Sequence, residues 1–193
     1  MTKLIAFDTS QAHCAAALAI GDRIVTRVDD MKRGQAEHLM PMLEEMLGSE
    51  GLAWADLDGI GVCTGPGNFT GIRISVAAAR GLALGLGKQA IGVDAFDAHA
   101  LGHDDPLHVA LPAPRGQAFV KQFSDSQPPE VFIHPADTPL PEVIALKPAA
   151  TFIADLARIA VTRLGQPAPA PAPLYLRPAD AAPARDAAPV LLD

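Results

Sequence analysis

The stretch from residue 65 to residue 75 reads GPGNFTGIRIS and decides the fold. Its three glycines permit backbone conformations and close approaches that a Cβ atom would block. The run that follows, residues 70–86, is rich in Ala, Gly and Leu and predicts a helix whose first N–H groups face the loop. Either an anion or another piece of backbone can occupy such a loop. Its spacing matches neither a dinucleotide-binding fingerprint nor a P-loop.

Three short apolar runs precede this loop and predict consecutive strands at residues 4–7, 14–20 and 23–28, with Asp8-Thr9-Ser10 at the end of the first strand. Gly21-Asp22 has the composition of a hairpin turn between the second and third strands. The rest of this half predicts helices at 35–47, 70–86 and 94–101, alternating with strands at 59–64 and 90–93. Such an order indicates an α/β domain with a mixed sheet.

Four segments together resemble the TsaB (YeaZ) family, the non-catalytic paralogues of the tRNA-modifying TsaD/Kae1 proteins. They are IAFDTS at 5–10, EHLMPML at 37–43, the glycine loop at 65–73 and PLYLR at 173–177. The resemblance implies an actin/sugar kinase/Hsp70-like (RNase H-like) α/β fold, with a mixed-sheet N-terminal lobe and a smaller, truncated second α/β lobe.

The same resemblance implies a function. A protein of this kind is an accessory subunit that binds and activates a TsaD-like catalytic subunit, together with a TsaE-like ATPase, in forming N6-threonylcarbamoyladenosine in tRNA. The family relation therefore leads us to expect no catalysis by this chain alone. Two alternatives stay open: a metallopeptidase-like enzyme, and a homodimeric scaffold protein that only retains the fold.

Composition predicts two unequal parts. Nearly all of the 16 glycines precede residue 105 and nearly all of the 18 prolines follow it. We expect an N-terminal lobe at 1–104, a smaller C-terminal lobe at 105–178 and a flexible tail at 179–193. The second lobe has strand patterns at 107–111 and 117–123, a helical pattern at 151–164, and an extended Pro/Ala connector at 167–173 that leads to a short strand at 174–176.

Charge and cysteine usage restrict the partners and the location. The formal net charge is −7 and the 15 Lys and Arg residues are scattered, so we expect tRNA contact only through a complex. The two cysteines lie in apolar surroundings and predict buried, reduced thiols. The apolar run at the start is too short for a signal peptide, and we expect no membrane span. These features favour a cytoplasmic protein.

Two helical patterns are candidates for a partner-binding face. The apolar side chains of residues 35–47 cover an arc of about 160°, wider than one core contact needs. We therefore expect an exposed plate anchored by Leu39, Met42, Leu43 and Met46. Arg73, Ala77 and Arg80 share a face of the next helix and would extend this plate. Because paralogous plates are alike, the isolated protein is also expected to pair with itself.

Phosphate contacts are a second candidate function. The residues placed to face a nucleotide phosphate are Asp8, Thr9, Ser10, Gly65, Gly67 and Thr70, although Asp8-Thr9-Ser10 equally fits a plain turn. No tightly bound cofactor is expected; ATP or ADP at the partner interface or in the cleft is the open alternative. The second lobe departs from the family here, because Pro112-Ala113-Pro114-Arg115 stands where family members usually have Asp-Ala-Arg.

The metallopeptidase alternative rests on His99 and His103, which are four residues apart on a helical pattern. In TsaD-like proteins a His-x-x-x-His pair holds the catalytic metal. Counting from Gly92 places that pair at Ala95 and His99 here, so the first ligand is missing. No motif supports a serine or cysteine nucleophile.

Overall fold

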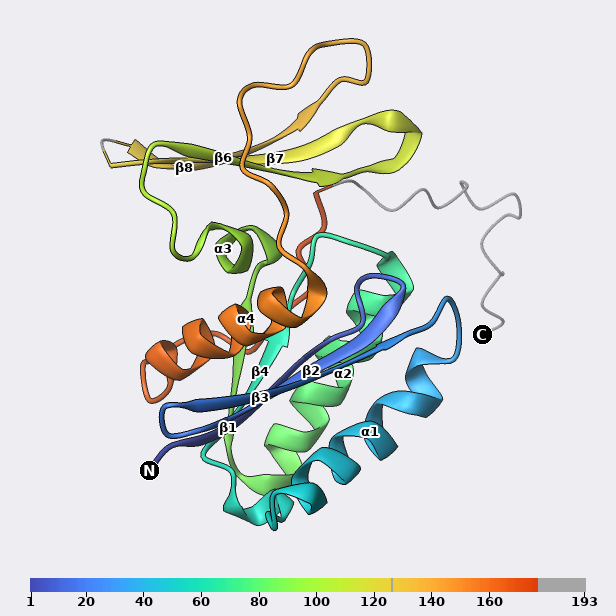
Figure 1. Ribbon diagram of the computed structural model, residues 1–193, viewed down its shortest axis with the longest axis vertical. Coiled ribbons are helices and arrows are strands. Elements are labelled where there is room, and N and C mark those ends of the chain that lie inside the picture. The colour runs from blue at the N-terminus through green and yellow to red at the C-terminus, as the bar shows by residue number, and fades with distance from the viewer. Residues whose placement is uncertain (126, 177–193) are drawn as a thin grey trace, which may run out of the picture.

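The computed structural model describes residues 1–125 and 127–176 (Figure 1). The first half follows the expected order of elements. Its strands are β1 (Lys3–Asp8), β2 (His13–Ile20), β3 (Arg23–Asp30), β4 (Gly59–Cys63) and β5 (Gln89–Val93), and its helices are α1 (Gln35–Ser49), α2 (Phe69–Leu86) and α3 (Ala95–Ala100). The tail expected at 179–193 lies outside the described residues.

These strands form one mixed sheet in the order β3-β2-β1-β4-β5. Strands β1, β2 and β3 pair antiparallel through tight turns, whereas β1, β4 and β5 pair parallel and are connected through helices. Central strands β1 and β4 are buried along almost their whole length, which explains why both are apolar without alternation. The expected α/β fold with a mixed sheet is confirmed.

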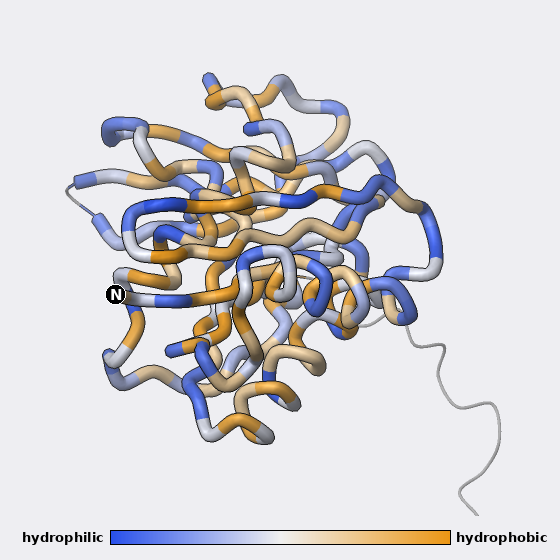
Figure 2. Tube along the Cα trace, turned by 60° about the horizontal axis from the view of Figure 1, so that its bottom comes forward, coloured by the Kyte–Doolittle hydropathy of each residue, from blue (hydrophilic) through white to orange (hydrophobic). Residues whose placement is uncertain are grey.

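Helices cover both faces of this sheet, with α1 and α2 on one side and α4 (Ala149–Arg163) on the other (Figure 1). Strand alternation supplies the two cores: Ile5 and Phe7 pack toward α1 and α2, while Leu4 and Ala6 pack toward α4. Figure 2 shows the apolar residues concentrated in the central strands, with hydrophilic residues common in the surrounding loops.

The second lobe is a three-stranded antiparallel sheet of β6 (Leu107–Pro112), β7 (Ala118–Ser124) and β8 (Gln127–His134). Pairing of β6 with β7 agrees with the sequence prediction. The sequence prediction missed β8 because Pro128 and Pro129 stand near its start. Both fall at an irregularity in the pairing of β8 with β7, where neither has a partner in the register. Residues 174–176 were expected to form a strand, but they do not join a sheet.

The expected division at residue 105 needs correction, because α4 belongs with the first sheet. Its apolar side packs Ile153, Leu156 and Ala160 into the core that contains Leu4 and Ala6. Without this helix, one face of the first sheet would be bare. The shift from a glycine-rich to a proline-rich composition marks where the chain enters the second sheet, but the chain then returns to the first lobe.

Candidate functional site

The glycine loop is a joint between two parts of the first lobe. The backbone of the β1–β2 turn fills it: a Cβ atom on Gly71 would lie 1.9 Å from the Thr9 carbonyl oxygen, and one on Gly67 would lie 2.6 Å from that of Ser10. Hydrogen bonds hold the joint, since the Thr9 hydroxyl donates to the Gly71 carbonyl at 2.6 Å and the Asn68 N–H donates to the Ser10 carbonyl at 2.7 Å. The glycines therefore permit close approach of backbone to backbone.

Asp8 makes its contacts within the same joint. Its carboxylate is fully buried, with one oxygen accepting the Ser10 N–H at 2.9 Å and the other lying 3.0 Å from Nε2 of His13. Each oxygen of this carboxylate thus has a partner within the protein. Sequence reasoning did not identify His13, whose only sign was a polar residue at the start of an apolar strand.

Asn68 fixes the start of α2. It is the N-cap residue, and its side-chain oxygen accepts the Gly71 N–H at 3.0 Å. This residue was also missed, although an Asn directly before a helical run is a recognised start signal. The cap satisfies one of the N–H groups that an anion would otherwise contact.

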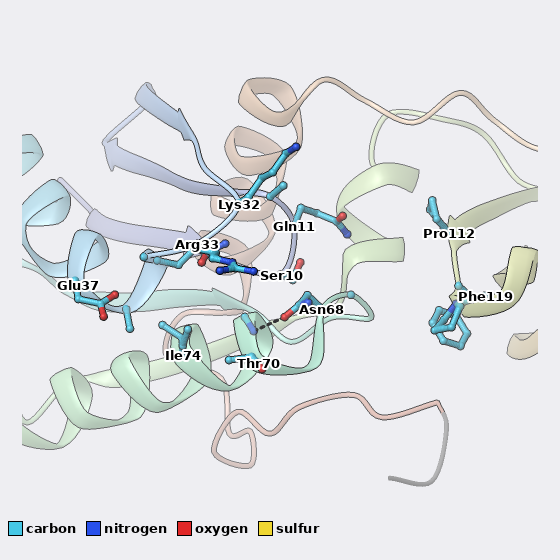
Figure 3. A pocket seen from close by; sticks show the side chains of 18 residues that line it. Ser10, Gln11, Lys32, Arg33, Glu37, Asn68, Thr70, Ile74, Pro112 and Phe119 are labelled. Carbon is cyan, nitrogen blue, oxygen red and sulfur yellow. Dashed lines mark hydrogen bonds between the residues drawn. The ribbon is translucent and has the colours of Figure 1, made fainter. Parts of the chain in front are cut away.

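A cleft of about 730 Å³ lies between the two lobes, beside the start of α2. In Figure 3, Pro112 and Phe119 of the second lobe lie across the opening from Gln11 and Asn68. Lys32 and Arg33, from the loop between β3 and α1, make the first-lobe wall cationic. The full lining comprises Ser10, Gln11, Ala12, Lys32, Arg33, Gly34, Gln35, Ala36, Glu37, Gly67, Asn68, Thr70, Gly71, Ile74, Pro112, Ala113, Pro114 and Phe119.

The cleft fits a Mg²⁺-nucleotide poorly. Of the six residues expected to face a phosphate, Ser10, Gly67 and Thr70 line it, whereas Asp8, Thr9 and Gly65 are buried and do not. Among the described lining residues, Glu37 is the only carboxylate. Pro112 lines the wall that the family usually gives an Asp. No chemical step through a nucleotide follows from this arrangement.

The expected docking plate on α1 must also be corrected. Leu39, Met42, Leu43 and Met46 are all buried, each 5% exposed or less. Their arc of about 160° is wide because α1 is covered on several sides. It packs on β1 and β2, against α2, and against the segment of Leu52, Trp54 and Leu57. These side chains belong to the core and are not available to a partner.

Helix α2 is different, because its outer face is exposed. Only Gly71, Ile72, Ser75, Val76, Ala79 and Ala83 of its residues are buried. Arg73, Ala77 and Arg80 lie on the outer face as expected, together with Leu84, which is 86% exposed. The helix contains no Asp or Glu, and within the described residues neither arginine forms a salt bridge.

One helix within the described residues, α2, is long and apolar enough to cross a membrane when judged by length and composition alone, although no such span was expected. About a third of it is buried within the protein. Through Ile72, Val76 and Ala79 it packs into the core shared with α1. Its apolar character is therefore divided between a core contact and an uncovered outer face.

His99 and His103 do not form a metal site. Helix α3 ends at Ala100, so the two side chains do not share a helical face. His99 is buried against Phe152, its Nδ1 accepts the Lys147 N–H at 3.1 Å, and burial lowers its pKa to about 4. His103 is exposed. No cluster of three metal-ligating side chains occurs in residues 1–125 and 127–176. The two histidines on which the metallopeptidase alternative rested therefore do not support it.

The two cysteines are buried free thiols, in agreement with the sequence prediction. Burial raises the pKa of Cys14 to about 11, and burial also raises the pKa of Cys63. A thiol with a raised pKa is protonated and a poor nucleophile at neutral pH. Neither cysteine supports a catalytic role.

An ionic network around a buried lysine joins the two lobes. Lys121 of β7 is 8% exposed, and its ammonium contacts Asp94 at 2.8 Å and Asp97 at 2.6 Å. Burial alone would lower the pKa of Lys121, but its bonds to both carboxylates reverse the effect and the pKa is raised. Arg163 of α4 contacts Asp97 at 2.7 Å. The network therefore fixes the second sheet to α3 and α4.

Comparison with known proteins agrees with this fold. The family model "TsaD: tRNA N6-adenosine threonylcarbamoyltransferase" matches residues 29–125, about half of the chain. The tRNA threonylcarbamoyladenosine biosynthesis protein TsaB of Escherichia coli K12 is 31% identical over 100 residues, covering 52% of this chain and 43% of that protein. A tRNA N6-adenosine threonylcarbamoyltransferase of Jannaschia sp. is 48% identical over 69 residues, covering 36% and 19%.

Among solved structures, YeaZ from Pseudomonas aeruginosa superimposes with a TM-score of 0.70 at 24% identity, covering 91% of this chain and all of that one. The chain therefore has the fold of YeaZ, in agreement with the actin-like α/β fold expected from the sequence. This chain spans less than half the length of the curated relatives named above. By its match to the family model over about half of its length, the chain belongs to the TsaD family, and in sequence and fold it is similar to TsaB (YeaZ) proteins.

Proposed function

We propose that this chain is an accessory subunit that binds and activates a TsaD-like threonylcarbamoyltransferase in tRNA modification in the cytoplasm. The observation that carries the proposal is the outer face of α2, an exposed apolar surface on a helix that contains no acidic residue. Within the described residues no group of three His, Cys, Asp or Glu side chains could hold a metal ion, and Nδ1 of His99 accepts the Lys147 N–H. A TsaE-like ATPase joins the same proposed assembly.

The chemistry of α2 fits a protein surface. Ala77, Gly81 and Gly85 recur every four residues on its exposed side and allow another backbone to come close. Leu84 and Phe69 are exposed large side chains at opposite ends of the helix, each worth about 1.5–3 kcal/mol when fully buried. A paralogue of the same fold has an equivalent pair of helices, which makes a TsaD-like protein the natural partner.

The charge of this chain favours tRNA binding by the whole complex over binding by this chain alone. The formal net charge is −7. Several of the 15 basic residues are already paired with acids, including Arg23, Arg27, Lys121 and Arg163. A chain of this balance has little long-range attraction for phosphates. The TsaD-like subunit is therefore expected to supply most of the RNA-binding surface.

Substitution of Leu84 by Glu tests the proposal. A carboxylate buried without a partner weakens an interface strongly, so titration calorimetry with the TsaD-like protein should show affinity lower by about 100-fold. Leu140→Glu is the matched control: Leu140 is 47% exposed but lies in the segment after β8. Threonylcarbamoyl transfer by the mixture should fall with Leu84→Glu only. Equal affinity for wild type and Leu84→Glu would refute the proposed face.

Self-association is a second candidate, favoured by the charges of the two helices. Glu37 and Glu44 are exposed on α1 seven residues apart, and Arg73 and Arg80 are exposed on α2 with the same spacing. A two-fold axis that sets α1 of one copy against α2 of another would bring these pairs together. In sedimentation equilibrium, Glu44→Arg and Arg80→Glu should each weaken self-association, and the double exchange should restore it. Unchanged association in both single variants removes this candidate.

A further inference from the structure

Two exposed aromatic side chains from distant parts of the sequence form a stack at the start of α2. The rings of Phe69 and Tyr175 have centroids 5.1 Å apart and planes inclined by 29°. Each side chain is 45% exposed. The guanidinium of Arg73 lies 4.5 Å from the Phe69 centroid, so a cation and two rings form one cluster. We call Arg73, Phe69 and Tyr175 the aromatic anchor.

Contacts with the first lobe hold the segment that carries Tyr175 in place. The Leu174 N–H donates to the carbonyl of Thr64 at 2.8 Å, directly before the glycine loop. Pro171 is buried and packs against the backbone of Gly92 on β5. Leu174 and Leu176 pack against the core cluster that both lobes share. Tyr175 is thereby fixed over Phe69, and partner binding would cost little side-chain ordering.

Residue chemistry indicates what this anchor binds. Tyr and Arg, fixed in position and half-exposed, are the residue types that dominate binding energy at protein interfaces. Within the described residues no carboxylate pairs with Arg73, and α2 offers none. A partner that covers Arg73 must therefore bring its own carboxylate, because an unpaired buried guanidinium is costly.

We propose that the aromatic anchor is the specificity-determining end of the α2 docking face, and that it takes an apolar segment of the TsaD-like partner that carries a carboxylate for Arg73. This inference rests on the proposed function and extends the docking face from α2 to the segment of residues 171–176. A stacked nucleobase is the competing occupant. The net charge of −7 argues against it, and the experiment separates the two.

The chain contains a single tyrosine, which permits a direct test. Incorporation of 3-fluorotyrosine gives one ¹⁹F resonance that reports on Tyr175 alone. On titration with the TsaD-like protein, the resonance should shift or broaden in step with the heat measured by calorimetry. Adenosine monophosphate or tRNA without that protein should leave the resonance unchanged. A shift produced by either of these and not by the TsaD-like protein would overturn the inference.

Variants complete the test. Tyr175→Ala and Arg73→Glu should each weaken binding by about 10-fold or more, whereas Tyr175→Phe keeps the ring and should stay within about 2-fold of wild type. Leu140→Ala controls for loss of an exposed side chain elsewhere, and thermal unfolding shows whether Tyr175→Ala releases its segment. If wild-type calorimetry shows binding but the resonance does not move at saturation, this inference fails and the proposed function stands. If wild type does not bind, both fail.

Discussion

Helices α1 and α2 share one face of the first sheet but distribute their apolar side chains differently. In α1 every large apolar residue except the partly exposed Met40 is buried, and the exposed positions include Glu37 and Glu44. In α2 the exposed side includes Phe69 and Leu84, with no acid anywhere in the helix. One helix is an ordinary amphipathic core element, and the other retains apolar surface that its own domain does not cover.

This difference teaches that the width of an apolar arc does not identify a docking helix. The arc of α1 is wide because several neighbours cover it, among them α2 and Leu57. The buried side of α2 packs chiefly on β4, and apart from the stack of Phe69 on Tyr175 its outer side is exposed. Whether a helix can bind a partner therefore depends on how many of its sides other elements cover, and only the tertiary structure gives that information.

The largest effect should come from Met42→Ala, compared with Leu84→Ala. Met42 is 1% exposed, so its truncation should lower the free energy of unfolding by about 2–5 kcal/mol. Leu84 is 86% exposed, and its truncation should change that energy by less than about 0.5 kcal/mol. Urea denaturation of both variants measures the difference. Similar losses in the two would contradict the contrast between the helices.

A second comparison lies within α2 itself, between buried Gly71 and exposed Gly81. Gly71→Ala places a Cβ 1.9 Å from the Thr9 carbonyl oxygen and should destabilise the protein by about 3 kcal/mol. Gly81→Ala meets nothing within 4 Å and should stabilise the protein by about 0.5–1 kcal/mol through helix propensity. Thermal unfolding of both variants shows whether each substitution lowers or raises the stability. A stable Gly71→Ala protein would show that the joint tolerates separation.

Much of the fold could be predicted from the sequence, because local signals and tertiary packing agree there. The apolar runs at residues 4–7 and 14–20 and the glycine loop before residue 70 place β1, β2 and α2 correctly. Prolines at 128 and 129 concealed β8, because the rule against proline in a strand does not apply where the pairing with β7 is irregular. The return of α4 to the first sheet is a long-range event that no local pattern encodes.

The smallest effect concerns pH and compares an interior with an exposed histidine. Burial lowers the pKa of His99 to about 4, against about 6.5 in an unfolded chain. Between pH 4 and pH 6.5 the imidazole is therefore protonated in the unfolded state and neutral in the folded state. The stability that neutral His99 contributes is complete above pH 6.5 and is lost as pH falls toward 4.

Denaturation at several pH values measures this loss. His99→Asn should flatten the profile between pH 6.5 and 4, and its amide oxygen can still accept the Lys147 N–H. His103→Asn changes an exposed residue and should retain the loss that His99 causes. A wild-type profile without a decline in this range would show that His99 is not held neutral by the fold.

The candidate site was less predictable than the fold. Sequence spacing correctly placed Arg73, Ala77 and Arg80 on one exposed face, because a continuous helix connects them. The same reasoning placed His99 and His103 together, but α3 ends at Ala100. The Phe69–Tyr175 stack joins two segments with no relation in sequence, so only the three-dimensional structure reveals it.

Hydroxyl-radical footprinting of the complex with the TsaD-like protein tests the central claim most directly. If the outer face of α2 docks, oxidation of Leu84 and Phe69 should fall on binding to the low level of buried Leu39, while exposed Leu140 continues to react. Unchanged oxidation of Leu84 and Phe69 in a saturated complex would contradict the claim that this face carries the function.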